Sequence, residues 1–328
     1  MKNQICVVAE TLRGELTDTT FAMLAAGRLL ADGLSTQLTA LLIGHQLAAG
    51  GLAKSLGAAD RVVCVDDPAL ADFNPEAFLR TAQAALASGP PRVTLLGHTA
   101  IGSDLACGLS RRLGIPLVTS CKTFWVQDGQ PQYSALICGG KILASGPLPG
   151  PACLVTVMPG GYKAEQGKVV RDVPVEAAAP PPDLAGVRTR FARYVEPPAG
   201  DVDIAKQPIL VSVGRGIQNK DNITLAEKLA EALGGVVTGS RPVIDQAWLP
   251  TTRLVGKSGK QVKPRLYLAL GISGAPEHAE GMREAELIVA INRDEKAPIY
   301  SLAHYGAVVD VLELIPALTQ QVRQAKGT

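Results

Sequence analysis

Residues 209–241 read ILVSVGRGIQNKDNITLAEKLAEALGGVVTGSR, and this stretch determines the fold that we expect for the chain. The β-branched run Ile209–Val213 predicts a buried strand, and apolar residues at helical spacing predict a helix over Thr224–Leu233. A second, shorter strand is expected at Val236–Thr238. A strand, a helix and a strand in succession are typical of a crossover unit, whose two strands lie parallel in one sheet.

The rest of the C-terminal half repeats this alternation. Strands are expected at Arg265–Leu270, Leu287–Ile291 and Gly306–Val309, followed by a helix from about Val311 to Gln324. Pro316 falls inside that helix, so the sequence predicts either a kink or a restart there. A parallel sheet flanked by helices is therefore expected for this half.

The N-terminal half begins with the same pattern and then departs from it. Buried strands and amphipathic helices alternate at first, with strands expected at Ile5–Val8, Gln37–Ile43, Arg61–Val65 and Val93–Leu96, and helices at Thr19–Ala31, Asn74–Ala87 and Ile101–Leu113. After Pro116 the apolar runs become short and are separated by Gly and Pro. They predict antiparallel strands that close the sheet, around Phe124 and at Tyr133–Cys138, Lys141–Ala144 and Cys153–Val157.

A proline-rich segment separates the two halves. Pro180–Pro182 and Pro197–Pro198 cannot lie inside helices or central strands, so this segment is expected to be connecting chain. Between them, Val187–Val195 is expected to add one more strand to the first domain. We therefore predict an α/β protein of two domains, residues 1–200 and 201–328, each a mostly parallel sheet flanked by helices, with the joint near Gly200.

Composition excludes several classes of protein. The chain has 328 residues, of which 47% are hydrophobic, and a net charge of +2, which argues against nucleic-acid binding through phosphate neutralisation. No apolar run approaches the ~18–20 residues of a membrane span. An acidic residue, Glu10, comes too early for a signal peptide, so a cytoplasmic location is expected. The six cysteines form no C-x-x-C pair, and neither a metal site nor a catalytic triad is predicted.

The ends of five predicted strands carry small or polar residues, namely Gly214-Arg215-Gly216, Ser240-Arg241, Gly271-Ile272-Ser273-Gly274, Asn292-Arg293-Asp294 and Asp310. Ligands of open parallel sheets bind beyond the carboxyl ends of the strands. Glycines there let the backbone approach a ligand, helix N-termini offer free N–H groups to a phosphate, and Arg215 can add a charge-assisted contact. Each strand end alone would fit an ordinary turn, but together they predict a nucleotide-cofactor site. Pro276 is expected in the first turn of a helix, with Glu277 and His278 at the end of the sheet.

Several segments resemble the α subunit of electron-transfer flavoprotein. In the C-terminal half they are VSVGRG (211–216), GSRPVID (239–245), VGKSGKQVKPRLY (255–267) and LYLALGISGAPEHAEGMREAELIVAINRDEKAPIYSLAHYGAVVDVLELIPAL (266–318). The N-terminal half matches more loosely, notably at HTAIGSDLACGLSRRLGIPLVTSC (98–121). The resemblance implies a Rossmann-like FAD-binding C-terminal domain and a heterodimer with a β subunit. It also implies transfer of single electrons from flavin dehydrogenases to a quinone oxidoreductase or a similar acceptor, with no catalytic side chain.

The resemblance also implies the cofactor contacts, residue by residue. Arg215 is expected to contact the pyrophosphate, Arg241 to lie against the isoalloxazine, and His278 to lie near its pyrimidine edge. Ser258 replaces the family's Thr and is expected near flavin N5, and Asp310 is expected at the adenosine end. The full set expected at FAD is Arg215, Ser240, Arg241, Val255, Gly256, Lys257, Ser258, Ser273, Gly274, Ala275, Pro276, Glu277, His278, Asn292, Asp310 and Val311.

Four positions depart from the family pattern. Lys257 replaces Gln, Pro276 and Glu277 replace an apolar residue and Gln, and His304 stands where the family usually has Asp. These departures suggest a member outside the fatty-acid oxidation group.

One hypothesis is that Arg241, His278 and Lys257 together stabilise the anionic reduced flavin, so that changing Lys257 to Gln would lower its reduction potential. The alternative for Lys257 is a side chain that turns to solvent. Two other functions stay open: the α subunit of a bifurcating, NADH-oxidising complex with a second FAD in the β subunit, and a nucleotide-binding scaffold without redox activity.

Overall fold

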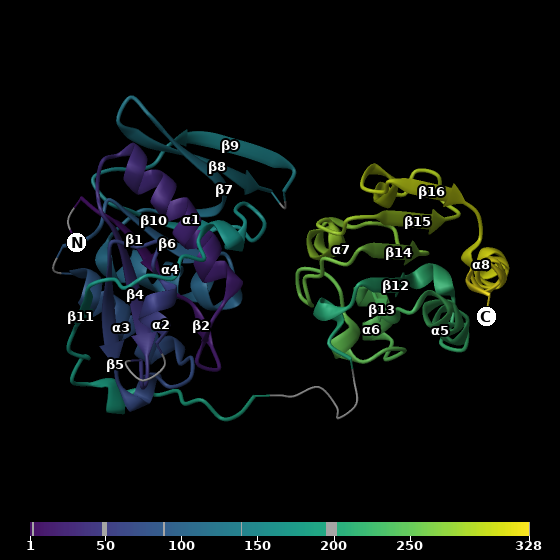
Figure 1. Cartoon of the computed structure of the whole chain (residues 1–328), viewed down its shortest axis with the longest axis horizontal. Helices are drawn as coiled ribbons and strands as arrows, with labels where there is room; N and C mark the ends of the chain where they lie inside the picture. The colour runs from purple at the N-terminus through teal and green to yellow at the C-terminus, as the bar shows by residue number, and fades with distance from the viewer. Residues whose placement is uncertain (2, 48–50, 88, 139, 195–201, 328) are drawn as a thin grey trace. The chain divides into compact units, whose positions relative to one another are not determined.

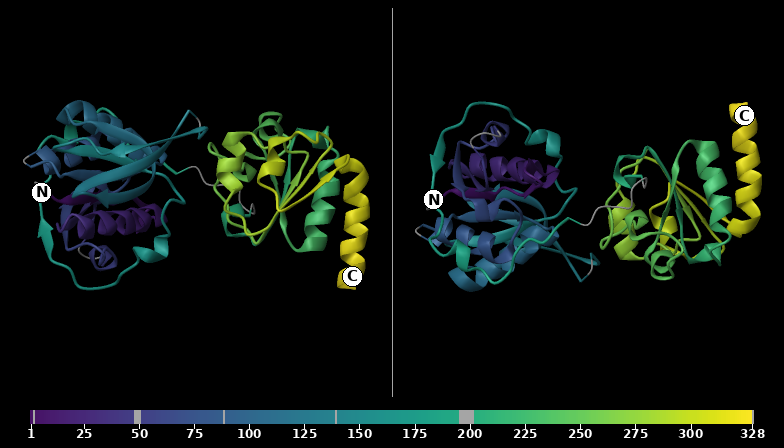
Figure 2. Two further views of the ribbon diagram at one scale, coloured as in Figure 1. Left: turned by 90° about the horizontal axis from the view of Figure 1, so that it is seen from above. Right: turned by 90° about the horizontal axis from the view of Figure 1, so that it is seen from below.

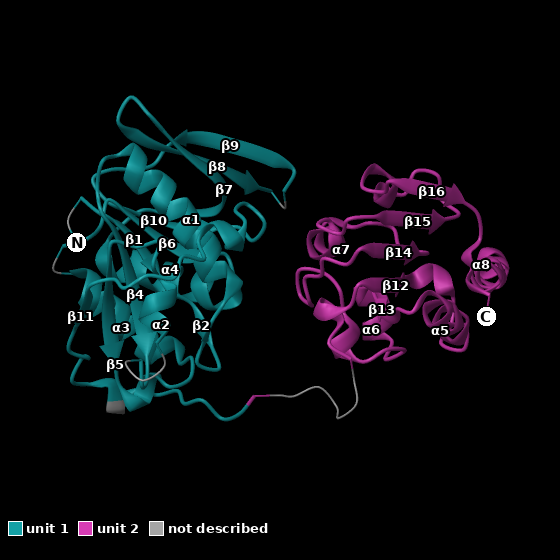
Figure 3. Cartoon of the chain, viewed as in Figure 1, with its two compact units in different colours: residues 1–193 teal, residues 194–328 magenta. Residues whose placement is uncertain are grey.

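The computed structural model describes residues 1, 3–47, 51–87, 89–138, 140–194 and 202–327 (Figure 1). The chain separates into two compact units, residues 1–193 and residues 194–328 (Figure 3). The joint predicted near Gly200 lies outside the described residues. Each unit is a mixed α/β body with a mostly parallel sheet, as the sequence predicts, and each is described by itself.

The first unit contains a nine-stranded sheet in the order β11-β5-β4-β1-β6-β10-β7-β8-β9. Its strands are β1 Ile5–Val8, β4 Leu38–Gly44, β5 Arg61–Asp66, β6 Val93–Gly97, β7 Leu117–Gln127, β8 Gln130–Ile137, β9 Ile142–Pro147, β10 Cys153–Val157 and β11 Val175–Ala177. A separate hairpin pairs β2 Thr11–Leu12 with β3 Glu15–Leu16. The helices are α1 Asp18–Gly33, α2 Leu52–Ser55, α3 Pro75–Ala87 and α4 Ala100–Leu113. Neighbours from β11 to β7 are parallel, whereas β7, β8 and β9 are antiparallel.

Alternating side chains of β1 show how this sheet obtains two hydrophobic faces. Ile5 and Val7 pack in the cluster that contains the buried side of α1, and Cys6 and Val8 pack in the cluster of α3 and α4. Successive side chains of a strand point to opposite faces, so a strand buried on both faces is apolar throughout. Burial also raises the pKa of the Cys6 thiol to about 12, so this cysteine behaves as a small hydrophobic residue.

Two predictions for the first unit are wrong. Cys153–Val157 was expected to be antiparallel, but it is an interior strand, β10, parallel to both β6 and β7 and buried at every position. Residues 187–194 form no strand, and Val195 lies outside the described residues. The side-chain amide of Asn74 holds this segment instead, donating to the Thr189 carbonyl at 2.7 Å. The added edge strand is β11, which pairs with β5.

The second unit contains a fully parallel five-stranded sheet in the order β13-β12-β14-β15-β16. Its strands are β12 Ile209–Val213, β13 Val236–Gly239, β14 Leu266–Leu270, β15 Ile288–Asn292 and β16 Tyr305–Val308, and its helices are α5 Ile223–Leu233, α6 Arg241–Asp245, α7 Pro276–Met282 and α8 Val311–Lys326. Each strand predicted for this half is present within one or two residues. Numbered along the chain, the order is 2-1-3-4-5, the doubly wound order that reverses between its first and third strands, rather than the 3-2-1-4-5-6 order of the Rossmann fold.

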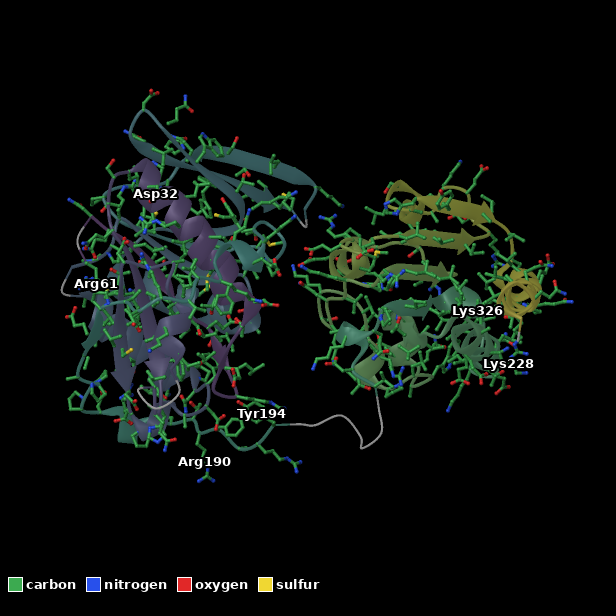
Figure 4. All side chains as sticks on the ribbon, viewed as in Figure 1. Asp32, Arg61, Arg190, Tyr194, Lys228 and Lys326 are labelled. Carbon is green, nitrogen blue, oxygen red and sulfur yellow. The ribbon has the colours of Figure 1, made fainter. Side chains whose placement is uncertain are left out.

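Helices cover both faces of this sheet. Helices α5 and α8 share one face with Val211, Val213 and Leu268 (Figure 2), and Tyr267 is buried on the other face with Met282 of α7. Lys326, labelled in Figure 4, donates from the end of α8 to the Leu233 carbonyl at the end of α5, at 2.9 Å.

Helix α8 runs through Pro316 without a break, so the predicted restart is wrong. Proline removes one backbone donor, but Ile315 and Thr319 are buried and hold the helix on the sheet on both sides of it.

The side chain of His304 is fixed by a hydrogen bond to the backbone. Its Nδ1 accepts a hydrogen bond from the backbone N–H of Ile288 at 2.9 Å, in the loop that precedes β16. A carboxylate at this position could accept a hydrogen bond from the same N–H. Within the described ranges, no helix is long and apolar enough to cross a membrane, and no cluster of three or more His, Cys, Asp or Glu could hold a metal ion.

Candidate functional site

A cavity of about 670 Å³ lies at the carboxyl ends of the strands of the second unit. This volume is within the range of pockets that bind small molecules and cofactors, roughly 300–1,000 Å³. The residues that line it are Arg215, Gly216, Gln218, Ser240, Arg241, Pro242, Ser258, Gly271, Ile272, Ser273, Gly274, Ala275, Glu277, His278, Asn292, Arg293, Asp294, Asp310 and Val311. Twelve of the sixteen residues predicted to contact the cofactor are among them; Val255, Gly256, Lys257 and Pro276 are not.

The base of the cavity lies where the strand order reverses, between β12 and β14. Here the N–H of Gly216 donates to the Gly271 carbonyl at 3.0 Å, and Gly271 has a φ of +64°. A Cβ on Gly216 would lie 2.6 Å from the Gly271 Cα, so the two loops touch backbone to backbone. The glycines of the GRG and GIS loops are thus required by the close contact between these two loops.

Arg241 connects two of the loops around the cavity. It is the first residue of α6, and its guanidinium donates from Nε to Asp245 at 2.6 Å and from Nη1 to the Ser258 hydroxyl at 3.4 Å. Ser240 is buried, and its hydroxyl does not cap α6. Ser240, Arg241 and Ser258 therefore form one polar side of the cavity.

His278 contributes a buried ring to the wall. Its Nε2 lies 2.8 Å from the hydroxyl of Tyr267, a fully buried residue of β14. Burial lowers the pKa of His278 to about 4, and the Val255 carbonyl only partly offsets this shift. No described residue forms a hydrogen bond of acceptable geometry with Nδ1. Burial therefore favours the neutral ring in the protein by itself, and a role of His278 in stabilising the reduced flavin stays a prediction.

Two side chains fix the opposite end of the cavity. The Asn292 amide donates to the Ile272 carbonyl at 2.9 Å, which ties the end of β15 to the GIS loop. The Asp310 carboxylate caps α8 by accepting from the Leu312 N–H at 2.9 Å, and Gln218 reaches its other oxygen at 3.5 Å.

Three of the remaining predicted residues shape the wall from behind. Gly256 has a φ of +140°, and a Cβ there would meet the Glu277 carbonyl at 2.9 Å. Val255 is buried beside it, and Pro276 is the first residue of α7, as predicted. This loop and the start of α7 are packed backbone against backbone.

Lys257 points away from the cavity. Its backbone N–H donates to the Glu277 carbonyl at 2.7 Å, but its side chain is 57% exposed, with Nζ 3.9 Å from the Glu280 carboxylate. The geometry therefore favours the solvent-facing alternative for this side chain.

Sequence reasoning missed Gln218, Pro242 and the contact between Tyr267 and His278. Gln218 has a φ of +71°, unusual for a residue with a side chain, and follows the GRG loop directly. Pro242 is the residue after the predicted Arg241. Nothing in the sequence indicates a role for Tyr267, because a single tyrosine in an apolar strand is typical of a core residue.

Family comparisons agree with this geometry. The family model described as the electron transfer flavoprotein domain matches residues 5–183, and the one described as the electron transfer flavoprotein FAD-binding domain matches residues 203–283. This chain belongs to the electron transfer flavoprotein α-subunit family. It is similar to the electron transfer flavoprotein subunit alpha of Bacillus subtilis (31% identity, covering 99% of this chain and 98% of the relative). It is also similar to the acryloyl-CoA reductase electron transfer subunit beta of Anaerotignum propionicum and Protein FixB of Clostridium saccharobutylicum (each 34% identity, covering 98% and 96%).

FAD is the cofactor of an electron transfer flavoprotein α subunit, and the cavity suits it. The arginines Arg215, Arg241 and Arg293 can bind the pyrophosphate or an electron-rich ring, and Asp310 can accept from ribose hydroxyls. Nδ1 of His278 forms no hydrogen bond of acceptable geometry with the described residues, although the Val255 carbonyl contributes to the pKa of the ring, so this nitrogen is able to bond a ligand. The residues present therefore fit FAD.

Proposed function

We propose that this chain is the FAD-carrying subunit of a heterodimer with a β subunit. It accepts electrons from a flavin dehydrogenase and passes them singly to a quinone oxidoreductase or a similar acceptor. The observation that carries the proposal is the cavity at the reversal of strand order, lined by twelve of the sixteen residues that the resemblance led us to expect at FAD. FAD, when bound, supplies all of the redox chemistry, and the protein supplies binding and electrostatics.

The roles of the residues follow from their places in the cavity. Arg215 holds the pyrophosphate beside the GRG loop, and Arg241 provides a cation beside the isoalloxazine. Asp310 and Gln218 orient the adenosine end, and His278 adds a neutral, oriented ring. Within the described lining, Ser258 is paired with Arg241 rather than with a general base, which fits a carrier better than an enzyme with its own substrate chemistry.

The relatives suggest which donor to test first. One of them is named as an electron transfer subunit of acryloyl-CoA reductase, so a flavoenzyme that acts on acyl-CoA thioesters is the first redox partner to try.

Co-expression with a β-type subunit, followed by an absorption spectrum and a count of released FAD, tests the proposal. One FAD per heterodimer, reduced by a flavin dehydrogenase but not by NADH, is the expected result. Two FAD per heterodimer with reduction by NADH would replace it with the bifurcating complex. A colourless dimer that cannot be reconstituted would leave only the scaffold function.

A further inference from the structure

His278, which lines the cavity, makes a polar contact with Tyr267, a fully buried residue behind it. The Tyr267 side chain has no exposed surface, and His278 is 7% exposed. The phenol oxygen and Nε2 are 2.8 Å apart, with the two rings tilted by 57°. Burial raises the pKa of Tyr267, so both partners are neutral and exchange one hydrogen bond.

The hydrogen-bonding partners of the surrounding buried groups indicate which of the two side chains, Tyr267 or His278, is the donor. Three buried side-chain atoms have no partner among the described residues: Ser212 Oγ, Thr238 Oγ1 and His278 Nδ1. Ser212 and Thr238 are register partners on β12 and β13. Both hydroxyls partly counter the rise in the pKa of Tyr267, yet neither reaches hydrogen-bonding geometry with it. Among the described residues, Nε2 of His278 is thus the one acceptor that reaches hydrogen-bonding distance and geometry with the phenol.

A neutral imidazole carries one hydrogen, on one ring nitrogen or the other. If Nε2 accepts from Tyr267, the hydrogen is on Nδ1, and the direction of the ring dipole is fixed. In the other tautomer this dipole points the opposite way. A ring that lines the cofactor cavity would then present a different field to the flavin.

We propose that Tyr267 is the positioning residue for His278: its O–H donates to Nε2 and holds the ring in the neutral tautomer with hydrogen on Nδ1. This inference rests on the proposed FAD site. His278 then acts on the flavin as an oriented dipole rather than as a charge. Arg241 and the other lining arginines supply the positive charge.

The test compares Tyr267→Phe with the wild-type chain in the FAD-loaded heterodimer. Nitrogen-15 NMR of labelled histidine reports the tautomer, and the chain has only four histidines, so His278→Gln suffices to assign the resonance. Tyr162→Phe is the control, because it removes the hydroxyl of a partly buried tyrosine in the first unit, which accepts from the Phe124 N–H at 2.7 Å.

In the wild type we expect His278 Nε2 to give an acceptor-type resonance and Nδ1 a protonated one. Tyr267→Phe should convert this to a mixture of tautomers and shift the reduction potential of bound FAD, and Tyr162→Phe should change neither. A protonated Nε2 in the wild type would overturn the proposal. So would a Tyr267→Phe protein with an unchanged tautomer and potential.

Two further arms keep the test decisive. If Tyr267→Phe does not fold, 3-fluorotyrosine can be incorporated instead, because fluorine makes the phenol a stronger hydrogen-bond donor. Among the histidines, only the Nε2 resonance of His278 should then shift. No shift would overturn the proposal. The tautomer can also be read without FAD. A protein that shows the expected tautomer but binds no FAD would therefore disprove the proposed function and leave the Tyr267 contact standing.

Discussion

Replacing Gly271 with alanine tests whether the contact between the GRG and GIS loops holds the site together. Gly271 has a φ of +64°, which costs an alanine about 1–2 kcal/mol. The new Cβ would lie 2.6 Å from the Gly216 Cα, whereas ordinary contacts begin at 3.4 Å, so one backbone must move by about 0.8 Å. Overpacking of this kind costs a further ~1–3 kcal/mol. The expected loss of unfolding free energy is about 2–5 kcal/mol.

Gly234→Ala is the matched control, because Gly234 has a φ of +77° with nothing within 4 Å of its Cβ position. It should lose only the conformational part, about 1–2 kcal/mol. Urea unfolding in a Trp125→Phe background lets Trp248, the other of the two tryptophans, report on the second unit alone. Gly271→Ala should also weaken FAD binding, and Gly234→Ala should not. Equal losses of stability in the two variants would refute the reasoning.

Three other perturbations test separate parts of the molecule. Asp310→Ala should destabilise α8 by about 0.5–2 kcal/mol through loss of its N-cap, and it should also weaken FAD binding. Asp310→Asn should keep the cap. Urea unfolding and FAD titration compare the two variants, and equal stability of both would contradict the role of Asp310 as the cap. Arg241→Gln should lower the reduction potential of bound FAD more than Lys257→Gln does, because Arg241 lines the cavity and Lys257 lies beside Glu280. Equal shifts in a redox titration would contradict the positions given to these two side chains. Burial raises the pKa of Glu10, so the stability that its protonated form contributes is present at low pH and is lost as pH rises through the raised pKa. Glu10→Gln should therefore raise the melting temperature at pH 8 and have little effect at pH 4, and an equal effect at both values would show that burial of the charge is not the cause.

Local sequence pattern predicted the second unit well because each of its strands is a short apolar run ended by glycine or a polar residue. The same logic located most of the cavity, since parallel strands bring their carboxyl ends to one edge. Pro276 began a helix as expected, because proline fits the first turn and few other helical positions.

The predictions that were wrong or missing concern features that depend on contacts between distant parts of the chain. An apolar run such as Cys153–Val157 reports burial but not direction, which is set by pairing with β6 and β7. Strand β11 is exposed throughout and has only three residues, too few for a pattern to predict it. It is held by its ladder to β5 and by the ion pair of Arg61 with Glu176 at 2.7 Å. The hydrogen bond between Tyr267 and His278 is also invisible in a linear sequence, because it joins a strand to the helix that covers it.

The described lining of the cavity contains no Phe, Tyr or Trp, and Tyr267 lies behind His278 rather than in the wall. Tryptophan and tyrosine rings that stack on a flavin quench its excited state by donating an electron to it. These walls thus contribute no stacked ring that would quench FAD, and FAD bound to this unit is expected to remain fluorescent. Because reduced flavin emits weakly, this light would report the loading of the subunit with electrons in real time, without any added dye.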